Sequence, residues 1–449
     1  MSNQLKRLNY SICFILIFAT MNTTMMNVAL PKFAEQFFLT PTEVSWVTSI
    51  FSLTFGIGAV IFGKLADIYP IRRLLVIGLI IFMIGSLIGF FSINFGWVIV
   101  ARIIQGFGAA ALPSLSMVMG PRFYPPEYRG KMLAMVFSIV ALGAAVGPIL
   151  GGFLTDWFGW KSLFVINFLS LLGLPIFLKY VPKEETKTGT FDILGAIIFM
   201  LAITAILMGI NVSSWLLLVA AVLLFIFYLQ SKRTADPFVE IQIFKNRSFS
   251  LVLLMSFLNT ITYMGTLFIL PLMLSKANGL STNWIGLVLF PGALLTAILG
   301  SQVGRLIQIK GSQFVNQCSF VLMAIACLGL STLVGFSPIW ISLMAIFVFL
   351  GFTANQTAFS NYISQILPPE KIGIGLGLFS LMTFLASAIG ISLYGRFLDL
   401  KIGHWNILNI SPYSSYSNAL LLAAIVIVLA IIVLTLEKTV KKREVLKSP

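Results

Sequence analysis

Residues 143–152 read Gly-Ala-Ala-Val-Gly-Pro-Ile-Leu-Gly-Gly and lie inside an apolar stretch without a charged residue. In a water-exposed helix each glycine would cost about 1 kcal/mol relative to alanine, and the proline would cost about 3 kcal/mol. In a membrane, neighbouring helices can cover the exposed backbone, and glycines spaced four apart let another helix come close. The stretch therefore predicts the middle of a membrane-spanning helix that packs closely against other helices and moves along them.

The chain as a whole has the composition of a membrane protein. Of its 449 residues, 59% are hydrophobic and 10% are charged, whereas about a quarter of the residues in a soluble globular protein are charged. Apolar stretches of about 20 residues, the length that crosses a bilayer as a helix, predict about fourteen spans. They cover residues 9–34, 43–66, 72–92, 95–118, 129–156, 160–181, 190–211, 215–231, 247–275, 282–307, 313–334, 338–366, 370–399 and 417–436. The sequence therefore predicts an all-α polytopic membrane protein.

The formal net charge of +15 follows this topology. With the N-terminus inside, most basic residues fall at cytoplasmic ends and loops, and the outer side holds only Lys32, Lys161, Lys276, Arg396 and Lys401. Because basic residues favour the cytoplasmic side, we expect a multi-pass protein of the cell membrane with an uncleaved first span and both termini in the cytoplasm. This placement accounts for the charge, so the expected partner is the lipid bilayer and not nucleic acid.

Residue types for metal or nucleotide chemistry are scarce in the sequence. The three cysteines, Cys13, Cys318 and Cys327, are widely scattered, and His404 is the single histidine, so we expect no metal site. The phosphate-binding pattern G-x-x-x-x-G-K-[ST] does not occur, which argues against ATP as an energy source. We expect no cofactor.

The chain repeats itself weakly. Pro125-Pro126-Glu127-x-x-Gly130 recurs as Pro368-Pro369-Glu370-x-x-Gly373, and the spans that follow end on Asp156 and Asp399, 243 residues apart like the two motifs. Gly63-Lys64-Leu65 recurs as Gly304-Arg305-Leu306. These matches predict two six-helix halves, residues 1–183 and 241–449, and between them a linker with two extra membrane helices, residues 184–240. Such duplicated halves are typical of secondary transporters; the alternative is that glycine-rich helices resemble each other by composition alone.

Four segments together resemble the major facilitator superfamily, in its fourteen-helix drug/proton antiporter branch. They are the loop motif 63–73, the span-four motif 102–108, the span-one motif Asn27-Val28-Ala29-Leu30-Pro31, and the glycine run 143–152 continued to residue 154. Residues 160–167 add a matching start to span six. The resemblance implies two six-helix bundles plus two extra central helices, and a monomer that works by alternating access.

Two sets of residues are candidates for gating. At the expected cytoplasmic mouth, the carboxylate of Asp67 can bridge to a helix end or to an arginine, although a solvated loop that only sets the topology is the alternative; the set is Gly63, Asp67, Arg72 and Arg73. The resemblance implies that the glycine run 143–152 closes the substrate pocket on the outer side. The residues concerned are Gly143, Gly147, Pro148, Gly151 and Gly152. Ordinary close packing without motion is the alternative there.

Arg102 is the basic residue placed well inside a span, where a lone charge costs about 2.5–3.5 kcal/mol. We therefore expect it to face the protein interior, with Gln105 beside it on the same helix face. The resemblance ties this arginine to proton coupling and implies an aspartate in span one, but that position is Asn22, which does not titrate. The expected proton carriers are Glu35 and Asp156 first, and then Asp399, which Arg396 three residues earlier could hold. The alternative for each acid is a helix-end carboxylate at the membrane interface.

The expected substrate pocket draws on both halves. Methionine and aromatic side chains make adaptable apolar walls, and amides in a membrane need partners. The candidates are Asn22, Met25, Met26, Phe51, Asn259, Tyr263, Phe290, Asn355, Gln356 and Phe359. Packing or lipid contact is the alternative for the apolar members.

The sequence thus predicts a proton-coupled multidrug efflux antiporter that exports small hydrophobic or weakly cationic drugs and dyes. A proton-coupled or facilitative carrier of one metabolite is the alternative. Clustered catalytic side chains of a membrane enzyme, or the charge ring or filter loop of a channel, are not evident in the sequence, so we expect no enzyme.

Overall fold

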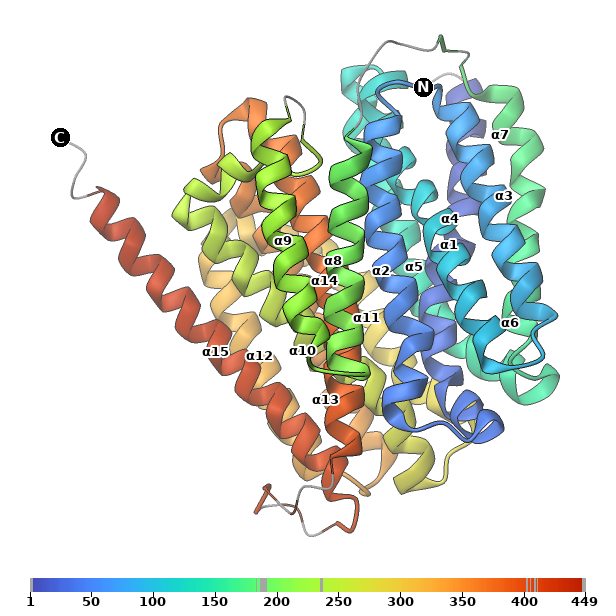
Figure 1. Ribbon diagram of the computed structural model, residues 1–449, viewed down its shortest axis with the longest axis vertical. Coiled ribbons are helices and arrows are strands. Elements are labelled where there is room, and N and C mark those ends of the chain that lie inside the picture. Colours follow the sequence, from blue (N-terminus) through green and yellow to red (C-terminus); the bar gives the residue numbers. More distant parts are fainter. Residues whose placement is uncertain are drawn as a thin grey trace. The chain divides into compact units, whose positions relative to one another are not determined.

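The computed structural model describes residues 3–182, 184–185, 192–234, 237–400, 403, 405–407, 409 and 411–445. These residues form helices and no strand (Figure 1). The helices are α1 (Asn3–Phe37), α2 (Pro41–Leu65), α3 (Ile71–Phe90), α4 (Phe95–Phe123), α5 (Pro126–Phe158), α6 (Ser162–Val165), α7 (Leu174–Tyr180), α8 (Ile193–Asn211), α9 (Leu216–Arg233), α10 (Arg247–Asn278), α11 (Thr282–Lys310), α12 (Ser312–Thr332), α13 (Pro338–Ile366), α14 (Ile372–Asp399) and α15 (Ser414–Val445). Three 3-10 helices, η1 (Ile166–Gly173), η2 (Ile241–Lys245) and η3 (Pro369–Lys371), complete the list.

In the described part of the chain, fourteen segments are long and apolar enough to cross a membrane, so the predicted all-α, fourteen-span fold is confirmed. Most boundaries differ from the expected ones by a few residues. The expected linker, residues 184–240, lies partly outside the described residues, which lack 186–191 and 235–236. Lys401 and His404 also lie outside them.

Capping residues explain several of these helix ends. The side chain of Asn94 accepts a hydrogen bond from the Trp97 amide at 3.1 Å, which starts α4, and Asn246 accepts one from the Phe249 amide at 3.0 Å, which starts α10. Asparagine satisfies the unpaired amides of a first turn in this way. Gly279 ends α10 with a φ of 64°, a left-handed conformation that glycine adopts without strain.

Span six is the one expected helix that is not regular. Its segment Ser162–Tyr180 consists of α6, the 3-10 helix η1 and α7. The Ser170 hydroxyl donates to the main-chain carbonyl of Asn167 at 2.7 Å, and the side-chain amide of Asn167 donates to the Leu163 carbonyl at 3.3 Å. Side chains therefore compete there for main-chain acceptors. Pro175 has no amide hydrogen to donate. Together they favour the tighter helix.

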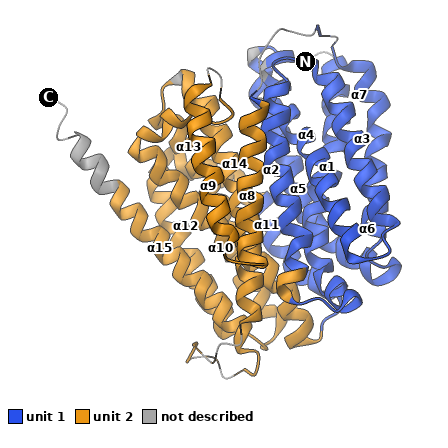
Figure 2. Ribbon diagram, viewed as in Figure 1, with its two compact units in different colours: residues 1–40, 44–192, 280–297 blue, residues 41–43, 193–279, 298–449 orange. Residues whose placement is uncertain are grey.

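The chain packs into two compact units, which Figure 2 colours separately. Unit 1 comprises residues 1–40, 44–192 and 280–297, and unit 2 comprises residues 41–43, 193–279 and 298–449. The N-terminal part of α11 therefore belongs to unit 1, and the first residues of α2 belong to unit 2. The division into halves at 1–183 and 241–449, with the connecting segment 184–240, stays a prediction.

The helix pairs within the two units follow the sequence repeat. In unit 1, α1 packs on α5 and on span six, and α3 packs on α4; in unit 2, α10 packs on α14 and α15, and α12 packs on α13. A Cβ at Gly108 of α4 would lie 2.7 Å from the carbonyl oxygen of Gly78 on α3, and a Cβ at Gly351 of α13 would lie 3.0 Å from that of Ser319 on α12. The same close approach thus recurs 243 residues later, which supports duplication of the chain.

The two additional helices, α8 and α9, pack on each other, and α8 also contacts α14. Asn211 at the end of α8 donates a hydrogen bond to Ser392 of α14 at 3.0 Å. Both helices therefore belong to unit 2 by their contacts.

The close approach of α3 and α4 gives a stability prediction. A side chain at Gly108 would meet the backbone of Gly78 and Phe82, which cannot move aside as a flexible side chain can. Gly108→Ala should therefore destabilise the protein by about 3 kcal/mol through overpacking, measured as the loss of thermal stability of the purified transporter. The matched control is Gly300→Ala on α11, where a Cβ meets nothing within 4 Å; equal melting temperatures for the two variants would contradict the packing argument.

Candidate functional site

The centre of unit 1 is the side chain of Arg102 on α4, which is fully buried. Its Nε atom donates to the Val47 carbonyl oxygen on α2 at 2.8 Å. Its Nη1 atom donates to Asn22 Oδ1 on α1 at 2.6 Å and to Gln105 Oε1 at 3.0 Å. The guanidinium lies over the Phe51 ring, 4.0 Å from the ring centroid. The expected neighbour Gln105 is in place, and Asn22 and Phe51 join the same cluster.

The hydrogen bonds extend from this arginine to two further helical segments. Gln105 Nε2 donates to Ser86 Oγ on α3 at 2.9 Å, and Asn167 Nδ2 of η1 donates to the same oxygen at 3.2 Å. Ser86 in turn donates to the Phe82 carbonyl at 3.0 Å. One connected polar network therefore joins α1, α2, α3, α4 and η1. The sequence analysis did not predict that Ser86 and Asn167 belong to this network. Each is a polar residue within an apolar span, and that pattern could have identified them.

The Arg102 centre is cationic and contains no acid. Among the described residues no carboxylate forms an ion pair with Arg102. All of its hydrogen-bond acceptors are neutral, and Nη2 has no acceptor in the described chain. A buried charge is usually paired with an opposite charge. Here the amide and carbonyl dipoles and the Phe51 ring take the place of an acidic partner and stabilise the guanidinium.

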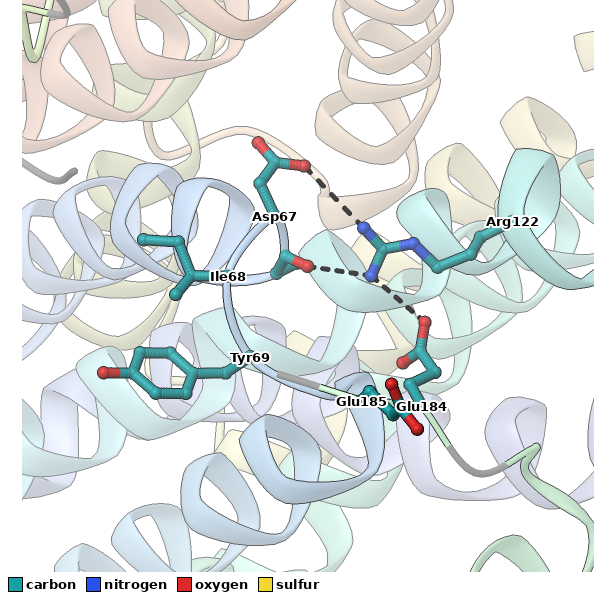
Figure 3. A pocket seen from close by; sticks show the side chains of 7 residues that line it. Asp67, Ile68, Tyr69, Arg122, Glu184 and Glu185 are labelled. Atoms are coloured by element: carbon teal, nitrogen blue, oxygen red, sulfur yellow. Dashed lines mark hydrogen bonds and ion pairs between the residues drawn. The ribbon is translucent and has the colours of Figure 1, made fainter. Parts of the chain in front are cut away.

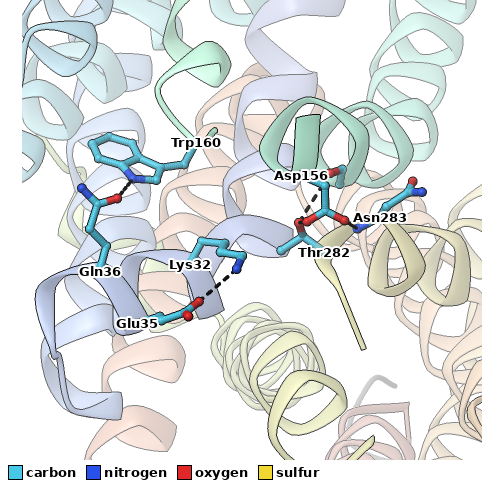
Figure 4. Close-up of polar contacts among 8 residues, drawn as sticks. Lys32, Glu35, Gln36, Asp156, Trp160, Thr282 and Asn283 are labelled. Atoms are coloured by element: carbon cyan, nitrogen blue, oxygen red, sulfur yellow. Dashed lines mark hydrogen bonds and ion pairs between the residues drawn. The ribbon is translucent and has the colours of Figure 1, made fainter. Parts of the chain in front are cut away.

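The acid at the end of α5 caps another helix. Asp156 accepts hydrogen bonds from the Asn283 amide at 2.8 Å and from the Thr282 hydroxyl, both in the first turn of α11 (Figure 4). A carboxylate at a helix N-terminus is favoured by the helix dipole and by the unpaired amides. Asp156 therefore holds the ends of α5 and α11 together.

The acid at the end of α14 makes the corresponding contact. Asp399 accepts a hydrogen bond from the Thr42 amide in the first turn of α2, at 2.9 Å. Thr42 and Asn283 stand 241 residues apart and the two aspartates 243, so both partners follow the repeat. The expected ion pair with Arg396 is not among those of the described residues, because Asp399 is directed at the backbone of α2.

Glu35, the other expected proton carrier, has a different environment. It forms an ion pair with Lys32 at 3.0 Å, with 73% of its own side chain exposed (Figure 4). Nearby, Gln36 accepts a hydrogen bond from the Trp160 indole (Figure 4). Glu35 is thus an exposed acid with a basic neighbour, unlike the two capping aspartates.

The loop after α2 contains an ionic cluster centred on Arg122 at the end of α4 (Figure 3). Arg122 contacts Asp67 at 3.8 Å and Glu184 at 3.3 Å, and it donates to the Ala66 carbonyl at 2.8 Å. Glu184 also accepts from the Ile71 amide at 2.8 Å, which caps α3.

This cluster differs from the expected arrangement of Asp67 with Arg72 and Arg73. In the described part of the chain neither arginine pairs with Asp67, because both lie in the first turn of α3 and Arg122 reaches the loop from α4. Gly63 has open space around it, with nothing within 4 Å of a Cβ placed there. Sequence spacing within one loop could not identify partners as distant in the chain as Arg122 and Glu184.

The glycine run of α5 has two packed faces. Gly143, Gly147 and Gly151 face Thr20, Thr24 and Met25 of α1, and a Cβ at Gly151 would lie 2.6 Å from the Met25 Cα. Their spacing of four puts them on one face of the helix. On the other face, a Cβ at Gly152 would lie 2.9 Å from the Asn283 Cα, and one at Gly286 of α11 would lie 2.9 Å from the Pro148 carbonyl carbon. The run therefore contacts both α1 and α11.

The amide candidates of unit 2 form two separate groups of neutral hydrogen bonds. Asn355 on α13 donates to Asn259 on α10 at 3.0 Å, and both are fully buried. Gln356 accepts from Ser256 at 3.4 Å and donates to Thr383 of α14 at 3.4 Å. These contacts link α10, α13 and α14.

The apolar candidates are placed mostly in packed surroundings. The Tyr263 ring stacks on Phe352 with centroids 3.8 Å apart, and Phe359 packs between Phe320 and Phe379. Met25 and Met26 are fully buried, and Phe290 is half-buried. Their role in a substrate pocket stays a prediction.

Sequence reasoning also missed a buried acid near the end of α15. Glu437 is fully buried and accepts hydrogen bonds from Gln313 of α12 at 2.9 Å and from the Tyr362 hydroxyl of α13. Glu437 lies one residue beyond the expected last span, 417–436, and was therefore not considered as a residue inside the membrane.

The Arg102 network yields a stability prediction. Gln105→Leu removes an acceptor from Arg102 and the donor to Ser86, so we expect a loss of about 1–3 kcal/mol in unfolding free energy. Chemical denaturation of the purified protein measures it. Ser114→Ala on the same helix is the control, because Ser114 bonds only to the carbonyl four residues earlier among the contacts described. A loss in Gln105→Leu no larger than in this control would show that the network contributes little.

Comparisons with known proteins agree with this architecture. The family model of the Major Facilitator Superfamily matches residues 12–391 and 252–448. The riboflavin transporter RibZ of Clostridioides difficile is 27% identical over 394 residues, covering 86% of each chain. The multidrug efflux pump SdrM of Staphylococcus aureus is 26% identical over 406 residues, covering 88% of this chain and 90% of the other.

Among solved structures, a POT family transporter in complex with a thioalcohol-conjugated peptide has a TM-score of 0.73 at 14% identity, over 96% of each chain. At that identity the likeness concerns the fold alone. The family match covers most of the sequence, and the fourteen apolar helices agree with a multi-pass membrane protein. The chain therefore belongs to the Major Facilitator Superfamily of membrane transporters.

Proposed function

We propose that this transporter is a proton-coupled antiporter that exports small hydrophobic or weakly cationic drugs and dyes across the cell membrane. The relative SdrM is a multidrug efflux pump, and the sequence motifs resemble the drug/proton antiporter branch. The sequence contains no ATP-binding motif, which favours an ion gradient as the energy source. The protein works as a monomer, with both termini in the cytoplasm and no cofactor.

The observation that carries the proposal is the pair of aspartate caps. In the proposed orientation, Asp156, which caps α11, and Asp399, which caps α2, lie at the outer side, where protons enter. An ionised carboxylate is held at a helix N-terminus by the amides and the dipole, and protonation removes the charge that makes this contact favourable. Protonation of either carboxylate would therefore weaken its cap and free the first turn of α11 or α2.

The other candidates take supporting roles. The Arg102 centre contains no titratable acid, so Arg102 and Gln105 contribute a fixed positive charge and a rigid frame. Glu35 is exposed and paired with Lys32, so it takes a secondary part in this proposal. Gly143–Gly152 provides the surface along which α5 moves against α1 and α11.

At the cytoplasmic end, the Arg122 cluster is the proposed lock. Arg122 ties the loop residue Asp67 to Glu184 in the segment after span six. Opening towards the cytoplasm would break these contacts. The ends of the transporter are thus held by different chemistry, ion pairs inside and helix caps outside.

A second candidate is a carrier of one specific metabolite, favoured by the riboflavin transporter among the relatives. The two candidates differ in their selectivity. Competition by chemically unrelated dyes indicates a multidrug pocket, whereas inhibition by riboflavin alone indicates a metabolite carrier.

The gradient dependence of transport tests the proposal. In everted vesicles energised to 100 mV, inward dye accumulation should reach at least about tenfold per charge moved, since each charge contributes about 2.3 kcal/mol. A protonophore should abolish the accumulation, and vesicles without the transporter are the control. Accumulation that persisted with the gradient collapsed would contradict proton coupling.

A further inference from the structure

Two hydrogen-bond donors at the Arg102 centre have no acceptor in the described chain. They are Nη2 of Arg102 and Nδ2 of Asn22. Both side chains are fully buried, and a 2.6 Å hydrogen bond joins Nη1 of the one to Oδ1 of the other. Buried donors are nearly always satisfied, by protein groups or by bound molecules, so an acceptor from outside the described chain completes this pair.

The chemistry of the two side chains fixes what kind of ligand fits. A guanidinium has five donors and no acceptor, so the Asn22 amide turns its oxygen to Arg102 and keeps Nδ2 for another partner. Phe51 covers one face of the guanidinium at 4.0 Å, and therefore an acceptor reaches Nη2 at the edge of the group. The part of the ligand that meets these two atoms must offer two acceptors.

The charge of the surroundings adds a second requirement. Within α1, α2, α3 and α4 the acidic residues are Glu35 and Glu43, near helix ends. Glu35 is thirteen residues along α1 from Asn22, about 20 Å at the helical rise. Among the described residues no carboxylate forms an ion pair with Arg102, and therefore an anionic acceptor gains most from binding here.

We propose that Arg102 and Asn22 bind the carboxylate of the transported molecule, one oxygen on Nη2 and the other on Nδ2. The inference rests on the proposed export function and specifies its substrate as a hydrophobic molecule that carries a carboxylate. Asparagine at position 22 leaves the arginine charge for the ligand, whereas an aspartate there would neutralise it within the protein.

A matched pair of dyes tests this directly. Rhodamine 110 carries a free carboxylate and rhodamine 123 is its methyl ester, so the two differ at the group in question. Fluorescence polarisation with the purified full-length transporter in detergent measures both affinities without any gradient. We expect rhodamine 110 to bind at least about tenfold more tightly, as a charge-assisted pair of hydrogen bonds implies.

Asn22→Asp should reverse the preference, because its own carboxylate then occupies the arginine. Asn9→Asp, the same change thirteen residues away on α1, is the control and should keep the wild-type preference. If Asn22→Asp bound neither dye, Arg102→Gln would decide: loss of the acid preference with rhodamine 123 binding retained supports the proposal.

Three results would overturn the inference: equal affinities in the wild type, an unchanged preference in Asn22→Asp, or an unchanged preference in Arg102→Gln. An acid preference seen only in chloride-free buffer would assign the donors to a free halide and would overturn it as well. Because binding is measured without a gradient, loss of proton coupling would leave the dye preference intact, so the two proposals fail separately.

Discussion

The buried guanidinium of Arg102 constrains unit 1 more than any other group. A cation inside a membrane span must be stabilised by the protein, and three neutral acceptors on α1, α2 and α4 do so. Each acceptor fixes the rotation of its helix, and the further bonds through Ser86 fix α3 and η1. Because no carboxylate pairs with this charge among the described residues, we propose that the centre holds an anionic ligand.

We propose that the chemistry that responds to protons lies elsewhere, in the caps at Asp156 and Asp399. The repeat places the same residue type at the end of α5 and of α14, and each aspartate meets the first turn of a helix from the other copy of the repeat. Thr42 and Asn283 donate through their backbone amides, so these contacts depend on the charge of the acid and little on the side chains at 42 and 283. The Thr282 hydroxyl adds a side-chain contact to Asp156. In this account the glycine faces allow α5 to move and the caps determine when it does.

Hydropathy alone was sufficient to predict the fourteen spans, and residue spacing revealed the repeat and the Arg102–Gln105 contact. The partners of Asp67 and the caps of α2 and α11 could not be predicted in this way. Arg122 is 55 residues from Asp67, and a backbone amide at a helix start leaves no residue pattern to recognise. Asn22 is the instructive intermediate case: its departure from the expected aspartate was visible in the sequence, while its free donor required the structure.

Substrate-induced proton release from the purified transporter is the decisive test of coupling through the two caps. We expect that adding a transported dye to weakly buffered wild-type protein releases protons, that Asp156→Asn and Asp399→Asn each reduce the release, and that the double variant abolishes it. Asp67→Asn, in the cluster at the other end, should leave the release unchanged. Full release from the double variant, or loss of release in Asp67→Asn alone, would contradict the assignment of proton coupling to the two caps.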